Sequence, residues 1–248
     1  MTKLSVNLNK IALLRNQRDI GIPNVMESAR TVIRAGAYGV TVHPRPDERH
    51  IRYTDAYELA ELIKSEYDNI EYNIEGNPFT GRHMDIMRDV RPDQATLVPD
   101  EHGANTSDHG WNLNQANIKR LVPVIEELKG LDIRVSLFMD PAPESMKTAK
   151  ELGADRIELY TEPYARAFME NDNVTELLAL YTRTARSACD LGLGVNAGHD
   201  LNLKNLGLFC KTVPDVLEVS IGHALIADAL EMGLLKAVRE YLKILPQK

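Results

Sequence analysis

Four junctions along the chain share one pattern, in which a helical segment ends at a glycine and a β-branched run begins within a few residues. They are AGAYGVTVH around Gly36, KGLDIRVSLF around Gly130, LGADRIELY around Gly153 and LGLGVNAG around Gly192. Glycine just beyond a helix end adopts the left-handed conformation at little steric cost. A helix that leads directly into a strand is the second half of a β-α-β unit. The repeated junction therefore predicts parallel strands joined by helices.

Short apolar runs recur along the whole chain, and amphipathic helical patterns separate most of them. In the intervening segments apolar residues return every three or four positions. The candidate strands are residues 4–9, 39–44, 70–75, 94–99, 133–139, 156–161, 194–198 and 216–221. Eight strands that alternate with helices in 248 residues match one closed, parallel, eight-stranded (β/α)₈ TIM barrel.

The competing fold is an open, doubly wound sheet. That fold would carry a glycine-rich turn after its first strand, but LSVNLNKIALL at the first candidate strand has none. No linker, low-complexity segment or charged block divides the chain. We therefore expect residues 1–248 to form a single catalytic barrel domain.

Charge and cysteine content exclude several classes of partner. The formal net charge is −7 at pH 7, so the chain lacks the broad positive charge that nucleic acids and anionic membranes attract. Cys189 and Cys210 lack the paired spacing of a zinc site or disulfide framework. No apolar run reaches the ~18 residues of a membrane span, and the N-terminus has no long apolar segment. We expect a cytoplasmic protein that binds neither nucleic acid nor membrane.

Polar and titratable residues gather where the candidate strands end. In barrels of this kind the active site lies at the carboxyl-terminal ends of the strands. The residues there are Asn7, Asn9, His43, Arg45, Glu75, Glu158, Thr161, Asn196, His199, Ser220 and His223. Strand residues two apart point the same way, so His43 and Arg45 share one side. Burial and mutual charge at one end of a barrel shift pKa values, as catalysis requires.

Each of these residues also has an ordinary structural interpretation. A strand-end histidine such as His43 is often a hydrogen-bonded structural residue. Glu75 and Glu158 could be paired with an inward-facing arginine, and the arginines of segment 45–52 could form a solvated charged surface. A functional site is favoured because several strands independently place titratable groups at the same end.

Two further segments predict a phosphate site. NAGHD (196–200) and SIGHA (220–224) both place a Gly-His pair just beyond a strand and ahead of a helix. The loops after strands seven and eight are the usual phosphate site of barrels, where backbone N–H groups and a helix N-terminus favour an anion. Gly198 and Gly222 could instead only turn the chain. The two pairs in register favour a phosphorylated substrate.

The polar stretch 100–112 follows the fourth candidate strand and has Trp111 near its end. Long loops on this face of a barrel are often lids, although this one could be an ordinary surface loop. A Schiff-base aldolase would need a lysine near an inner strand end, and only Lys10, just past the first strand, comes close. No HExxH or dense ligand cluster predicts a bound metal. We therefore expect acid–base chemistry by histidine and glutamate, without metal or cofactor.

These residues occur in motifs that resemble the pyridoxine 5'-phosphate synthase family of vitamin B6 biosynthesis. The motifs are NLNKIALLRNQR (7–18), TVHPRPDERHI (41–51), NIEG (73–76), LVPD (97–100), NTSDHGW (105–111), VSLFMD (135–140), IELYTE (157–162), VNAGH (195–199) and IGHALI (221–226). They follow the family's order and cover most of the chain. The resemblance implies that 3-amino-2-oxopropyl phosphate and 1-deoxy-D-xylulose 5-phosphate condense to pyridoxine 5'-phosphate, phosphate and water. It also implies a homo-oligomer built from dimers, commonly an octamer.

The resemblance further implies a role for each matched residue. The catalytic positions are the proton acceptors His43 and Glu75, the proton donor His199, and Glu158 as the carboxylate that stabilises the transition state. Contacts to deoxyxylulose phosphate match Asn9, Lys10, Arg45, His50 and Thr106. Contacts to the amino-ketone phosphate match Asn7, Arg18, Gly222 and His223. Arg18 would reach the active site of a neighbouring subunit.

The chain departs from the commoner family pattern at four positions. Asn9 and Lys10 stand where many members have aspartate and histidine. Asp200 stands where many have glycine, and its backbone N–H can still serve a phosphate, so we keep it among the expected substrate contacts. Glu162 also replaces a glycine.

Two other functions stay open on the sequence. A metal-dependent aldolase or epimerase of a phosphorylated sugar could use His43, Glu75, Glu158 and His199 as ligands. A non-catalytic phosphosugar-binding protein could use the phosphate loops without chemistry.

Overall fold

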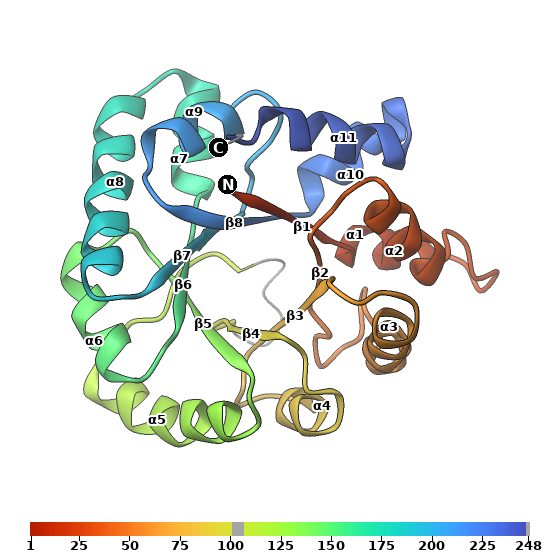
Figure 1. Ribbon diagram of the computed structural model, residues 1–248, viewed down its shortest axis with the longest axis horizontal. Coiled ribbons are helices and arrows are strands. Elements are labelled where there is room, and N and C mark those ends of the chain that lie inside the picture. Colours follow the sequence, from red (N-terminus) through yellow and green to blue (C-terminus); the bar gives the residue numbers. More distant parts are fainter. Residues whose placement is uncertain (101–106, 247–248) are drawn as a thin grey trace.

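The structure is a computed structural model that describes residues 1–100 and 107–246. Its strands form one closed parallel barrel in the order β1-β2-β3-β4-β5-β6-β7-β8, and β8 pairs with β1. Figure 1 shows the strands at the centre and the helices around them. The predicted (β/α)₈ TIM barrel is confirmed. No helix in these two ranges is long and apolar enough to cross a membrane.

The strands lie close to the candidate runs, and most are shorter. They are β1 (Lys3–Asn7), β2 (Gly39–Val42), β3 (Glu71–Gly76), β4 (Gln94–Leu97), β5 (Arg134–Met139), β6 (Arg156–Leu159), β7 (Gly194–Ala197) and β8 (Val216–Ile221). The helices are α1 (Asn9–Arg15), α2 (Val25–Arg34), α3 (Tyr53–Glu66), α4 (His83–Val90), α5 (Gln115–Gly130), α6 (Met146–Glu151), α7 (Glu162–Glu170), α8 (Val174–Asp190), α9 (Leu206–Thr212), α10 (His223–Met232) and α11 (Leu234–Ile244), with a 3₁₀ turn, η1, at Pro143–Ser145.

The helix-to-strand junctions follow the predicted glycine pattern at three of four places. Gly36, Gly153 and Gly192 have positive φ angles of 108, 92 and 72°. The prediction is wrong at Gly130, which is the last residue of α5. The left-handed residue after that helix is Asp132, with φ 61°. Aspartate tolerates this conformation because its short polar side chain can hydrogen-bond locally.

A network of polar side chains crosses the barrel from strand to strand. The Ser5 and Thr41 hydroxyls are 2.7 Å apart. Asn73 donates to Thr41 Oγ1 at 3.3 Å and accepts from Thr96 Oγ1 at 3.0 Å. The alternate residues of β1 and β2, such as Leu4 and Val6, are fully buried on the opposite, helix-covered side. The hydrophobic core therefore lies between strands and helices, and the barrel interior is hydrogen-bonded.

A second polar layer lies nearer the amino-terminal ends of the strands. Arg134 pairs with Glu71, and Arg156 donates to Glu218 at 3.0 Å and to Asn196 at 3.1 Å. Asn196, a polar residue noted near the end of its strand, therefore bonds into this layer and does not line the cavity described below.

Replacing Asn73 with alanine should lower the free energy of unfolding by about 2–4 kcal/mol, because two hydroxyls lose a partner and a small cavity remains. Urea unfolding followed by circular dichroism measures the change. The matched control is Asn112→Ala, at an exposed position, which should change stability by no more than about 0.5 kcal/mol. Equal losses in the two variants would contradict a stabilising role for the interior network.

Candidate active site

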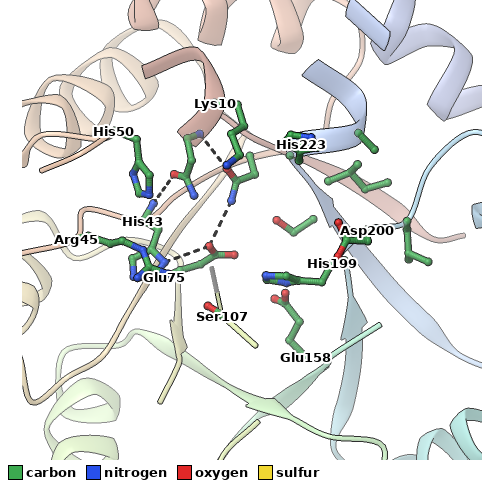
Figure 2. Close-up of a pocket in the computed structure, with 18 residues that line it drawn as sticks. Lys10, His43, Arg45, His50, Glu75, Ser107, Glu158, His199, Asp200 and His223 are labelled. Atoms are coloured by element: carbon green, nitrogen blue, oxygen red, sulfur yellow. Dashed lines mark hydrogen bonds and ion pairs between the residues drawn. The ribbon is translucent and has the colours of Figure 1, made fainter. Parts of the chain in front are cut away.

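The carboxyl-terminal ends of the strands surround a cavity of about 370 Å³ (Figure 2). Most of the residues expected from the sequence line it together: Asn7, Asn9, Lys10, His43, Arg45, His50, Glu75, Glu158, His199, Asp200, Gly222 and His223. Two expected residues are not placed there. Arg18 is exposed in the turn after α1, and Thr106 lies outside the described residues.

Two asparagines connect the ends of the first three strands. Asn7 donates to Glu75 Oε2 at 3.3 Å and accepts from the Asn9 backbone N–H at 2.9 Å. The Asn9 side-chain oxygen accepts from the His43 backbone N–H at 2.9 Å. Because Asn9 also begins α1, the turn from β1 into this helix fixes both the amide and Lys10 beside the cavity. The network therefore holds Glu75 and His43 in place.

His43 lies between two carboxyl groups. Its Nδ1 is 3.9 Å from Glu75 Oε2, and its Nε2 is 3.9 Å from Asp100 Oδ2. Asp100 is also ion-paired with Arg45. Burial holds the pKa of His43 well below its usual value, and the positive charge of Arg45 lowers it further. A neutral imidazole at physiological pH can accept a proton.

The two buried glutamates have pKa values shifted in the opposite direction. Burial raises the pKa of Glu75 to about 8, and the neighbouring charge of Asp100 adds to the rise. Burial also holds the pKa of Glu158 well above its usual value, with further contributions from Glu75 and Glu218. No described residue bonds to Glu158 Oε2. Both carboxyls can therefore hold a proton near neutral pH and release it when a positive charge arrives.

His199 is held on the other side of the cavity by aromatic rings. Its ring centroid lies 5.0 Å from that of Phe138 and 5.7 Å from that of Tyr160. Burial lowers the pKa of His199, and the charges of Asp200 and Asp100 partly offset this. Thr161 donates from Oγ1 to the His199 carbonyl at 2.6 Å and does not line the cavity. Thr161 therefore positions the loop after β7 instead of forming part of the cavity wall.

His50 has a defined tautomer in this arrangement. Its Nδ1 accepts from the Ile51 backbone N–H at 2.9 Å, so Nε2 carries the ring proton. Burial lowers the pKa of His50 to about 3, together with the charges of Arg45 and Lys10. The neutral ring can therefore donate to an anionic ligand from Nε2.

The glycines of the expected phosphate loops are required by close packing. A Cβ at Gly198 would lie 2.3 Å from the Ser220 carbonyl oxygen, and one at Gly222 would lie 3.1 Å from Asn7 Cβ. Neither has a positive φ. Asp200, by contrast, has φ 61°, the region that favours glycine. The α10 helix begins directly after Gly222.

Sequence reasoning missed several residues at the cavity. Ser107, Leu201, Ile221 and Ala224 line it, and Ser220 lines it without having been assigned a role. The buried Ser220 hydroxyl has no partner among the described residues. The sequence placed Ser220 at the end of its strand, and its alternation with Glu218 along β8 agrees with this inward position. Residues 1–100 and 107–246 contain no group of three His, Cys, Asp or Glu residues that could hold a metal ion.

Comparison with solved structures identifies the same fold in proteins of low sequence identity. Tryptophan synthase from M. tuberculosis matches with a TM-score of 0.65 at 12% identity, covering 99% of this chain and 94% of that one. Phosphoribosylanthranilate isomerase from Thermotoga maritima matches with a TM-score of 0.56 at 14% identity, covering 98% of each chain. At such identities the likeness concerns the fold alone.

Comparison with curated sequences identifies close relatives. The pyridoxine 5'-phosphate synthase of Albidiferax ferrireducens is 53% identical, over 99% of this chain and 98% of the relative. Those of Christiangramia forsetii and Rhizobium meliloti are 50% and 48% identical, over 99% and 96% of this chain and 100% and 96% of the relatives. A family model described as "Pyridoxal phosphate biosynthesis protein PdxJ" matches residues 4–247. The resemblance seen in the motifs is thereby confirmed, and the chain belongs to this family of pyridoxal phosphate biosynthesis proteins.

Proposed function

We propose that this chain is a pyridoxine 5'-phosphate synthase that condenses 3-amino-2-oxopropyl phosphate with 1-deoxy-D-xylulose 5-phosphate. Relatives that share about half of its residues carry that name. The observation that carries the proposal is that neutral histidines and raised-pKa glutamates meet in one cavity beside the two glycine loops. This combination suits proton transfer on phosphorylated substrates.

The two sides of the cavity suit two phosphoryl groups. Arg45 and His50 lie on one side in Figure 2, where they can bind deoxyxylulose phosphate. His199 and His223 lie on the other, near the start of α10. The N-terminus of a helix and the backbone N–H groups of the glycine loops favour an anion there. This side can therefore bind the amino-ketone phosphate. Lys10 lies beside His223 and can serve either phosphate.

The catalytic steps follow from the protonation states. The amine of one substrate attacks the ketone of the other, and the resulting imine needs no lysine from the protein. Neutral His43 accepts a proton directly, and Glu75 accepts one after it has released its own proton beside the positively charged substrate amine. The Glu158 carboxyl, which holds a proton at neutral pH, can supply that proton to His199, and His199 passes it to the departing oxygen. The carboxylate that remains at Glu158 stabilises the cationic intermediate. Each proton transfer gains about 10²–10⁴-fold from a well-placed group, whereas positioning two substrates contributes roughly 7–11 kcal/mol.

Water exclusion would protect the imine, and the stretch 100–112 is the segment expected to provide it. Its far end is fixed, because Trp111 Nε1 donates to the Leu97 carbonyl at 2.9 Å and the Trp111 N–H donates to the Phe138 carbonyl at 2.9 Å. Closure over substrate stays a prediction, since residues 101–106 lie outside the described part of the chain.

The proposal includes self-association through an apolar groove between α1 and α10. The groove has a volume of about 330 Å³ and is lined by Lys10, Leu13, Leu14, Gln17, His223, Ile226, Ala227 and Leu230. Leu230 is 77% exposed. In the nearby turn, Ile20 and Ile22 are 55% and 63% exposed. Lys10 and His223 also line the catalytic cavity. A second copy seated on this groove would bring its turn, with Arg18, close to that cavity.

Purified protein mixed with both substrates should release pyridoxine 5'-phosphate and free phosphate, and exhaustive chelation should leave this turnover unchanged. His43→Ala should abolish product while the barrel still melts cooperatively. Loss of activity on chelation would support the metal-dependent aldolase or epimerase. Ligand-induced stabilisation without phosphate release would support the binding protein instead.

Glu75→Gln should retain substrate binding and lose turnover, because glutamine cannot accept a proton. Between about pH 5 and 8, the Glu75→Gln variant should also become increasingly more stable than the wild type as the pH rises. The raised pKa of Glu75 means that the folded chain holds a proton that the unfolded chain has released, so the wild type loses stability across this window. Thermal unfolding at several pH values measures the difference. The matched control is Glu176→Gln, at an exposed position; an equal pH trend in that variant would contradict the assignment.

Leu230→Asp should lower the oligomer mass measured by analytical ultracentrifugation, whereas Met169→Asp, at another exposed apolar position on α7, should not. Arg18→Ala and His43→Ala should each be inactive, and mixing the two should partly restore turnover if Arg18 acts in the neighbouring cavity. Full activity of Arg18→Ala, or no restoration on mixing, would contradict a shared site.

A further inference from the structure

A second, smaller cavity lies behind His43, on the side away from the phosphate loops. Its volume is about 30 Å³. The polar groups that line it include His43, Arg45, Asn77, His83 and Asp100. It therefore connects the expected proton acceptor with a histidine that neither the motifs nor the proposed mechanism uses.

His83 is the first residue of α4, and its ring is packed against the end of β3. A Cβ at Gly76 would lie only 2.2 Å from His83 Nδ1. Gly76 has no positive φ, so glycine is required here to make room for the ring. The residue before it is Glu75. The strand that carries one proton acceptor is thus shaped to hold an imidazole directly behind it.

His83 is 3% exposed, and neither of its ring nitrogens has a hydrogen-bond partner among the described residues. A buried imidazole without a partner is costly, and buried polar groups are normally satisfied by protein or by ordered water. A water needs about 10–15 Å³ and two to four polar partners. The cavity beside His83 is large enough for water, and Asn77, Asp100 and His43 supply polar atoms around it.

We propose that His83 is a positioning residue of the active site, which acts on His43 through water held in this small cavity. The inference rests on the proposed function, in which His43 accepts a proton from substrate. Water bridged to His83 supplies the hydrogen bonds that stabilise His43 when it becomes an imidazolium.

The surroundings of His43 explain why such help matters. Its two ring nitrogens are each 3.9 Å from a carboxyl oxygen, too far for a direct hydrogen bond. The titratable groups that face it from the neighbouring elements are Glu75, Asp100, Arg45, His50, His83 and His199. Burial lowers the pKa of His83 to about 4, so His83 is neutral at physiological pH. It can accept a hydrogen bond through water without adding a like charge.

His83→Phe and His83→Gln separate hydrogen bonding from shape. Phenylalanine fills the space and cannot accept, so we expect kcat to fall roughly 10-fold to 100-fold with KM nearly unchanged, and the acidic limb of the pH profile of kcat/KM to move to lower pH. Glutamine keeps a donor and an acceptor and should retain turnover within about threefold of wild type. An unchanged rate and pH profile in His83→Phe, or an equal loss in His83→Gln, would overturn the inference.

Two measurements without substrate test the same inference independently. The ring-nitrogen NMR titration of His43 should move to lower pH in His83→Phe and stay in place in His83→Gln. A crystal structure that resolves solvent should place water between His83 and His43, and a dry cavity would refute the bridge. The His43→Ala variant distinguishes a failure of the proposed function from a failure of the His83 inference. If it is active, the role of His43 in the proposed function fails. If it is inactive while His83→Phe matches wild type, only the role of His83 fails.

Discussion

Removal of water from the ends of the strands is the constraint on which the rest of this site depends. Burial is the largest cause of the shifted pKa at His43, Glu75 and Glu158, and it moves histidines down and carboxyls up. The two carboxyls therefore hold protons that they would lose in water at neutral pH, and His43 stays neutral even in slightly acidic solution. Neutral His43 can accept a proton from a substrate, and the protonated carboxyls of Glu75 and Glu158 can give one up.

The barrel maintains this desolvation by placing its hydrophobic core outside the strands. Residues such as Leu4 and Val6 pack under the helices, while the interior holds hydrogen-bonded hydroxyls and amides. Buried polar groups are costly unless they are paired, so the chain of contacts through Thr41 and Asn73 lets the barrel keep a polar interior. The same alternation that buries Ile74 under the helices directs Asn73 and Glu75 inward. The same alternation of side chains along the strands therefore supplies both the hydrophobic core and the residues of the site.

The fold was predictable because helix ends, glycines and apolar periodicity are local signals. The parts that sequence could not give depend on contacts between distant segments. The first strand ends at Asn7, not residue 9, because Asn9 begins a helix and bonds to His43. Asn196 looked like a site residue by position, yet it joins Arg156 below the cavity. His83 lies in no recognisable motif, because its proposed role depends on a cavity that it shares with His43, 40 positions earlier in the chain.

The four positions at which the resemblance implies a departure from the commoner family pattern place charge unequally around the site. Amide for carboxylate at Asn9 keeps the bond to the His43 backbone, because either oxygen can accept it. This replacement and Lys10 each make the first-strand side more positive. Asp200 and Glu162 each make the opposite side more negative, and both charges add to the burial that raises the pKa of Tyr160 to about 12. The two sides of the cavity are therefore electrostatically unequal, with Lys10 on one and Asp200 on the other. In the proposed function this asymmetry helps to distinguish two phosphorylated substrates, because the more anionic ligand is directed to the side of Lys10.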